Sequence, residues 1–208
     1  MREVMAPFVP MAQDVKLENE NNINCKCTLV FSTFNIYASW DRLIIRYDGV
    51  LEGLSDNNSI VQEPFFNLFG KIKETRGFGK VINCLCATIF VNHMKGAKKE
   101  ELVGGFVEKH LKMDHISRLV DKPSDTCIVL ERNTEGRQVT ISYGPYLGIE
   151  DIQKRSGLPK NPEVLDHLDI FGEMIEVKIF ETDSSPEFRT YKRFLDETIN
   201  FKNLIWDI

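Results

Sequence analysis

The most constraining feature of this 208-residue sequence is a hairpin pattern between residues 127 and 143. Two runs rich in β-branched and apolar residues, 127–130 and 139–143, flank the turn-forming sequence Asn133-Thr134-Glu135-Gly136. A glycine in such a turn supplies a backbone conformation that most residues avoid, which lets two neighbouring strands run in opposite directions. The sequence therefore predicts an antiparallel sheet.

Other segments extend this pattern. Alternating apolar and polar residues predict strands at 25–31, 42–47 and 173–179, and the apolar run 81–91 predicts a central strand covered on both faces. Helical spacing predicts a long helix from Lys98 to about Val120, with a kink or close packing contact at Gly104-Gly105, and another helix opening near Ser184. Because helices and strands interleave without a regular βαβ rhythm, the predicted fold class is α+β: a mostly antiparallel sheet with helices packed on one face.

Residues 1–24 show no sustained period. They mix Pro7 and Pro10 with several asparagines, so we expect a flexible N-terminal arm followed by a single α+β domain at 25–208. The arm also carries apolar residues that could dock on a neighbouring protein, namely Val4, Met5, Phe8, Val9 and Met11.

Composition limits the function classes. The chain is 42% hydrophobic and 27% charged, close to the globular average, and its net charge of −5 argues against a globally basic nucleic-acid binder. No apolar run is long enough for a membrane span, and the first residues lack a signal-peptide core. With five cysteines, an odd number, we expect an intracellular protein, soluble or peripheral to a membrane, in a reducing compartment.

The pairs Cys25/Cys27 and Cys84/Cys86 invite a zinc site, because thiolates are good zinc ligands. However, a spacing of two within a strand places both side chains of a pair on one sheet face, where they serve as small hydrophobes. The sequence also lacks a Gly-x-Ser-x-Gly turn and a phosphate-binding Walker pattern. We therefore predict no enzymatic activity, no catalytic residue, no metal or other cofactor and no small-molecule substrate.

Two basic segments could contact nucleic acid, a membrane surface or an acidic partner. Residues 76–81 resemble the octapeptide of RNA recognition motif domains in their opening four residues and the valine, although Lys80 and Asn83 replace two of its base-stacking aromatics. The candidate contacts are Lys71, Lys73, Arg76, Phe78 and Lys80 in the first segment and Lys95, Lys98 and Lys99 in the second.

Aromatic residues are plentiful, with 14 Phe, 5 Tyr and 2 Trp. Several fall in predicted loops or ends, Trp40 among them, where aromatic side chains often anchor interfaces. The alternative is that each packs on the core of its own chain. The aromatic residues expected to make self-association or partner contacts are Phe8, Tyr143, Tyr146 and Trp206.

The leading hypothesis is a non-enzymatic structural or interaction protein that forms a homo-oligomer and contacts another protein or a membrane. A virion matrix- or coat-type role is its most concrete version. One alternative is a nucleic-acid-associated accessory factor that uses the basic segments 71–80 and 95–99, whose binding would fall steeply with salt. Another is a thiol- or zinc-dependent enzyme built on the cysteines.

Overall fold

The computed structural model divides the chain into two compact units, Met1–Lys80 and Val81–Ile208. Residues 25–208 were expected to form one domain, but the division at Lys80 falls inside this segment. The strands before Lys80 and those after it belong to different sheets. The structure describes residues 5–6, 8–19, 24–32, 34–47, 49, 74, 80–111, 116, 118–120, 122–148, 150–151, 171–184 and 187–207.

Unit 1 contains an antiparallel meander in which each strand pairs with the next along the chain. In β2 and β3 exposed or half-buried residues alternate with buried ones, so each strand turns one side toward the core. Leu29 of β2 and Ile36 of β3 lie on that apolar face, and Met5 and Phe8 belong to the same buried cluster. The strands are β1 (Asp14–Glu18), β2 (Lys26–Val30), β3 (Phe34–Ala38) and β4 (Leu43–Tyr47).

The segment expected to be an arm is therefore part of this unit. Its residues form the 3-10 helix η1 (Val9–Met11) and the edge strand β1. The expectation of an arm without regular structure is corrected because Met5 and Phe8 reach the apolar face of the meander and bury there. Burying apolar side chains of this size gives a short segment enough free energy to order against a sheet.

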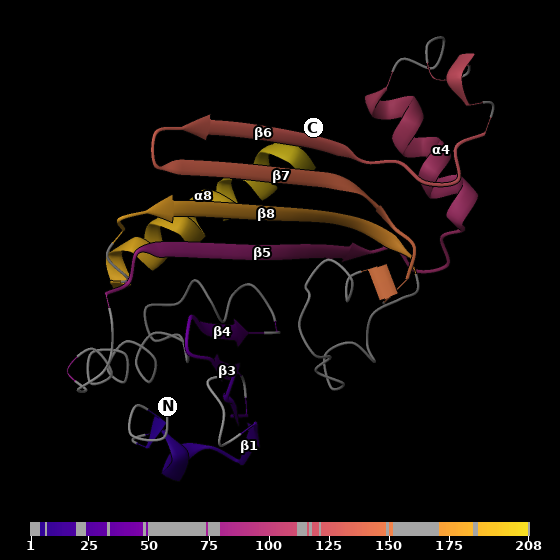
Figure 1. The fold of residues 1–208 in the computed structure, drawn as a ribbon. Helices are drawn as coiled ribbons and strands as arrows, with labels where there is room; N and C mark the ends of the chain where they lie inside the picture. Colours follow the sequence, from indigo (N-terminus) through magenta and orange to yellow (C-terminus); the bar gives the residue numbers. More distant parts are fainter. Residues whose placement is uncertain are drawn as a thin grey trace. The chain divides into compact units, whose positions relative to one another are not determined.

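Unit 2 contains the second antiparallel sheet, with the strand order β5-β8-β7-β6 (Figure 1). The predicted hairpin is confirmed: β6 and β7 pair from Ile128↔Tyr143 to Thr134↔Arg137, and Gly136 closes the turn with a φ of 71°. β8 contains the strand predicted at 173–179. The strands are β5 (Asn83–His93), β6 (Ile128–Thr134), β7 (Arg137–Tyr146) and β8 (Gly172–Thr182).

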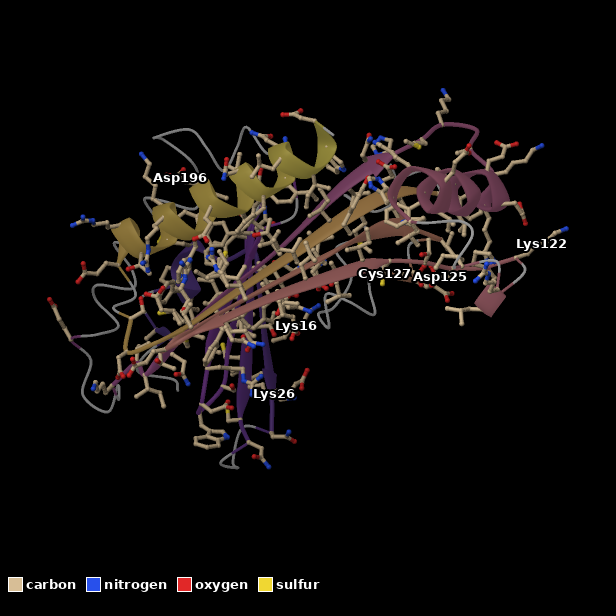
Figure 2. All side chains as sticks on the ribbon, turned by 90° about the horizontal axis from the view of Figure 1, so that it is seen from above. Lys16, Lys26, Lys122, Asp125, Cys127 and Asp196 are labelled. Atoms are coloured by element: carbon tan, nitrogen blue, oxygen red, sulfur yellow. The ribbon has the colours of Figure 1, made fainter. Side chains whose placement is uncertain are left out.

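The helices of unit 2 lie on one face of this sheet, as the predicted α+β class requires. The helices whose bounds fall within the described residues of unit 2 are α4 (Lys99–His110) and α8 (Phe188–Trp206), and Figure 2 shows both on the same side of the strands. The register places Phe90 and Tyr143 on one face through their shared neighbour Ile175. Ring contacts join this face to both helices: Phe90 to Trp206 of α8 at 6.4 Å, and Tyr143 to Phe106 of α4 at 5.1 Å.

Alternating charges also tie α8 to the sheet. Glu197 of α8 pairs with Arg137 of β7 and, at 3.2 Å, with Arg132 of β6. Arg193 of α8 pairs with Glu181 of β8 at 2.6 Å. Burial opposes ionisation of Glu181, but hydrogen bonds from Arg193 and Ser184 outweigh it and lower the pKa of Glu181. These ion pairs hold one turn of the helix, from Arg193 to Glu197, against the sheet.

Three expectations for unit 2 are corrected by the structure. Most of the apolar run at 81–91 lies in β5, which is at the edge of the described sheet rather than in its centre, and Leu85 on it is 64% exposed. The helix predicted to run from Lys98 to about Val120 ends at His110, since the next residue, Leu111, has an extended backbone. Gly104 and Gly105 were expected to mark a kink or a close contact, but a Cβ at either position would have nothing within 4 Å.

Candidate interaction surface

The structure buries most of the aromatic residues that were expected to be exposed contacts. Phe8 and Tyr146 are fully buried, and Tyr143 is 5% exposed. The expectation of exposed anchors is corrected at these positions, because each ring is covered by residues distant in the sequence, such as Met174 beside Tyr146. Trp206 is half-buried at the end of α8, where its ring contacts Phe90.

Tyr143 joins α4 to the sheet. Its hydroxyl lies 3.4 Å from Nε2 of His110 and also hydrogen-bonds with Glu173. Burial, followed by the charge and the hydrogen bond of Glu173, raises the pKa of Tyr143 to about 12. The phenol therefore stays protonated and acts as a donor at physiological pH, which suits a structural joint.

The basic segments are only partly within the described residues. Lys71, Lys73, Arg76 and Phe78 lie outside them, and Lys80 is exposed. Lys95 and Lys98 are exposed and Lys99 is half-buried at the start of α4. There, Lys98 pairs with Glu101 at 3.8 Å, and Glu100 adds a second carboxylate in the first turn. The positive charge of this segment is thus largely balanced locally.

The paired cysteines, Cys25/Cys27 and Cys84/Cys86, are buried or half-buried, as expected of small apolar residues in a sheet. Cys84 and Cys86 are half-buried on the helix-covered face of β5, and burial raises the pKa of the Cys86 thiol. Cys27 is buried in unit 1, whereas Cys127 is exposed. Within the described parts of the chain, no group of at least three His, Cys, Asp or Glu side chains could hold a metal ion.

An apolar surface remains in unit 1, where η1 lies beside β1. Met5 and Phe8 point into the core, but Val9 and Met11, which follow them, are 43% and 54% exposed. Val15 on β1 is 36% exposed. An open hollow of about 270 Å³ lies here, which we name the arm groove; it is lined by Met5, Ala6, Val9, Pro10, Val15, Leu17 and Cys27.

The arm groove lies at the free edge of the meander. β1 pairs only with β2 among the described strands, and all five of its residues are exposed. The register pairs Val15 with Leu29 and Leu17 with Cys27, so both β1 side chains lie on the apolar face. The apolar residues of η1 were recognisable in the sequence, but the strand β1 was not predicted. The pattern that indicates this strand is the alternation of charged and apolar residues in Asp14-Val15-Lys16-Leu17-Glu18.

A second exposed feature of unit 1 is the tip of the β3–β4 hairpin. Trp40 is 70% exposed there. The Ser39 N–H donates to the Arg42 carbonyl at 2.9 Å, and the Asp41 carboxylate accepts hydrogen bonds from Arg42 and Ser39. These bonds lower the pKa of Asp41 to about 2, Arg42 contributing most. The exposed Trp40 indole thus lies on a turn that hydrogen bonds among Ser39, Asp41 and Arg42 hold in shape.

No helix in the described parts of the chain is long and apolar enough to cross a membrane. Comparison of the whole chain with known proteins finds no matching family model, no matching curated protein and no matching solved structure. The candidate surface therefore rests on the geometry of unit 1 alone.

Proposed function

We propose that this chain is a non-enzymatic interaction protein that acts by self-association and by contact with a partner, using the arm groove of unit 1. The observation that carries the proposal is the gathering of partly exposed Val9, Val15 and Leu17 around one apolar hollow, with exposed Met11 close by in η1. Full burial of one such side chain contributes about 1.5–3 kcal/mol, so covering the group supplies a useful share of a binding free energy.

The chemistry of the arm groove supports binding rather than catalysis. Its lining consists of aliphatic side chains, Met5, Pro10 and the Cys27 thiol. Burial, followed by the charge of Cys25, raises the pKa of Cys27, which keeps this thiol protonated and weakly nucleophilic. The groove itself thus offers apolar area and no acid or base for a reaction.

The most concrete form of the proposal is a structural protein of matrix or coat type, which must contact both itself and a second surface. Exposed Trp40 provides a second candidate contact, because tryptophan is enriched among residues that dominate binding energy. The five free cysteines fit a reducing intracellular compartment.

Light scattering on a size-exclusion column tests self-association when the loaded concentration is varied at low and high salt. We expect the wild-type mass to rise with concentration, and Val9→Ser with Met11→Ser to shift the rise to higher concentration. The matched control is Leu204→Ser, which replaces a residue that is 57% exposed on α8.

A mass that stays monomeric at every concentration would refute self-association. An equal effect of the control and the groove variant would remove the arm groove from the proposal. Absorbance at 260 nm that high salt strips from the peak would instead favour the nucleic-acid alternative.

A further inference from the structure

The free edge of β1 carries a charge pattern that can complement itself. The strand reads Asp14-Val15-Lys16-Leu17-Glu18, and every second residue is charged. Because Val15 and Leu17 lie on the apolar face of the sheet, the charged residues share the opposite face. Lys16 lies 3.6 Å from Asp14 on that face, and both side chains are well exposed.

Hydrogen bonding shows which backbone groups face outward. The Val15 N–H donates to the side chain of Asp14, at 2.8 Å, rather than to β2. In an antiparallel pair alternate residues bond across the ladder, so Val15 and Leu17 turn their backbone groups toward the free edge. An edge of this kind is a template for another strand.

We propose that a second copy of this chain occupies this edge, with β1 pairing antiparallel to the second copy's β1 about Val15. The inference rests on the proposed function and names the partner of the arm groove. In a symmetric pair of this kind, residues of the same sheet face lie opposite each other. Asp14 then lies opposite Lys16 of the second copy on either side of the axis, which forms a square of alternating charges.

The other symmetric registers fit less well. Centring the pair on Lys16 would set Lys16 against Lys16 and Asp14 against Glu18, which are like charges that repel. Centring it on Leu17 would set Lys16 against Glu18 but would require Asn19 to continue the strand, and its φ of 53° ends it. Centring on Val15 pairs residues 14–16 of the two copies, and the ladder ends before Gln13, whose N–H donates to the Val30 carbonyl of β2 at 2.8 Å.

This register also extends the arm groove. Val15 and Leu17 of the second copy continue the apolar face beside η1, so the hollow that Val9, Val15 and Leu17 line continues across the axis. The paired segment is short, since β1 has five residues. A contact of this size is typical of weak, reversible association.

Sedimentation equilibrium on the full chain tests the pairing through charge reversal. We expect Lys16→Glu to weaken self-association by roughly tenfold or more, because it sets the new carboxylate against Asp14 of the second copy. The double variant Asp14→Lys with Lys16→Asp restores opposite charges both across the axis and within the strand, and we expect it to restore association. The matched control is Lys26→Glu, which makes the same charge change on the same face of β2, one strand away from the edge (Figure 2).

Hydrogen exchange supplies a readout that does not depend on the variants. The Val15 amide of the wild type should gain protection as concentration rises, while the Lys26 amide, which is not on the free edge, should not.

The outcomes separate this inference from the proposed function. If Val9→Ser with Met11→Ser weakens association but Lys16→Glu does not, the arm groove stands and the β1 pairing is overturned. If neither change weakens it, both proposals fall. Rescue by Glu18→Lys with Lys16→Glu, in place of the Asp14 exchange, would overturn the Val15-centred register.

Discussion

The described parts of the two units each contain a four-stranded sheet, but different elements pack on the two sheets. In unit 1 Met5 and Phe8, from the segment that leads into η1, pack on the apolar face. In the described part of unit 2 the helices α4 and α8 pack on the sheet, and ion pairs such as Arg193–Glu181 hold α8 in place. Val9 and Val15, beside the unit 1 segment, stay partly exposed, and the arm groove lies there. Apolar side chains at this edge of the unit 1 sheet therefore remain accessible to solvent.

The largest expected effect is a loss of stability in unit 1 that leaves the core of unit 2 unchanged. Leu29→Ala removes a fully buried side chain beneath Met5 and Phe8, and we expect a loss of about 2–5 kcal/mol in the free energy of unfolding of unit 1. Hydrogen exchange should show the amides of β1–β4 losing protection while those of β5–β8 keep theirs. Loss of protection in both sheets would mean that the units unfold as one.

The next effect lies at the crowded end of the unit 2 sheet. A Cβ at Gly172 would approach the Asn92 carbonyl oxygen to 2.2 Å and the Tyr146 ring to 2.6 Å. Because backbone cannot yield easily, Gly172→Ala should destabilise unit 2 by about 3 kcal/mol in denaturant unfolding. An unchanged midpoint would show that the strands separate there at little cost.

Removing one carboxylate tests how firmly charge holds α8. Glu197→Gln leaves Arg137 without its ionic partner on α8, and we expect unit 2 to lose about 1–2 kcal/mol in denaturant unfolding. Asp196→Asn is the matched control, because this exposed neighbour points away from the sheet (Figure 2). Equal effects of the two variants would assign the loss to net charge rather than to the ion pairs.

Glu181, which pairs with Arg193 of α8, makes the stability of unit 2 depend on pH in the acid range. The pKa of Glu181 is lower in the folded chain than its ordinary value of 4.5, so its contribution to stability is present above that value. It is lost as pH falls through the folded pKa. Thermal unfolding between pH 6 and roughly pH 3 should therefore show a shallower fall for Glu181→Gln than for the wild type. Parallel curves would contradict this assignment.

The smallest effect is a gain. Gly104 is exposed within α4 and has free space where a Cβ would lie. Gly104→Ala should stabilise the helix by about 0.5–1 kcal/mol, since glycine is a poor helix former. Circular dichroism during thermal unfolding measures the change. A destabilised variant would reveal a contact of Gly104 with a partner or another copy.

Local patterns were predictable from the sequence. The hairpin that Gly136 closes and the alternation in β8 depend on neighbours along the chain, and both were found. The side-chain periodicity of Cys84 and Cys86 likewise predicted that they share a face.

Features that depend on distant residues were not predictable. Whether Phe8 or Tyr146 is buried depends on which far segment covers it, and no local pattern encodes that choice. The edge position of β5 follows from its pairing with β8, which lies nearly at the other end of unit 2. β1 was missed because five alternating residues within a polar, asparagine-rich stretch give a weak signal. As a result, the expectation that Phe8, Tyr143 and Tyr146 are exposed was wrong.

The pairing of β5 with β8 has a consequence for how the chain folds during synthesis. Each strand of the unit 1 meander finds its partner in the strand made just before it, so that sheet can form while the ribosome is still translating unit 2. Asn83 must wait for Thr182 to be made before β5 gains its only neighbour among the described strands. Long-range pairing of this kind is slow, so β5 spends that interval as an apolar segment without its β8 partner, which is the condition under which a nascent chain is prone to aggregate.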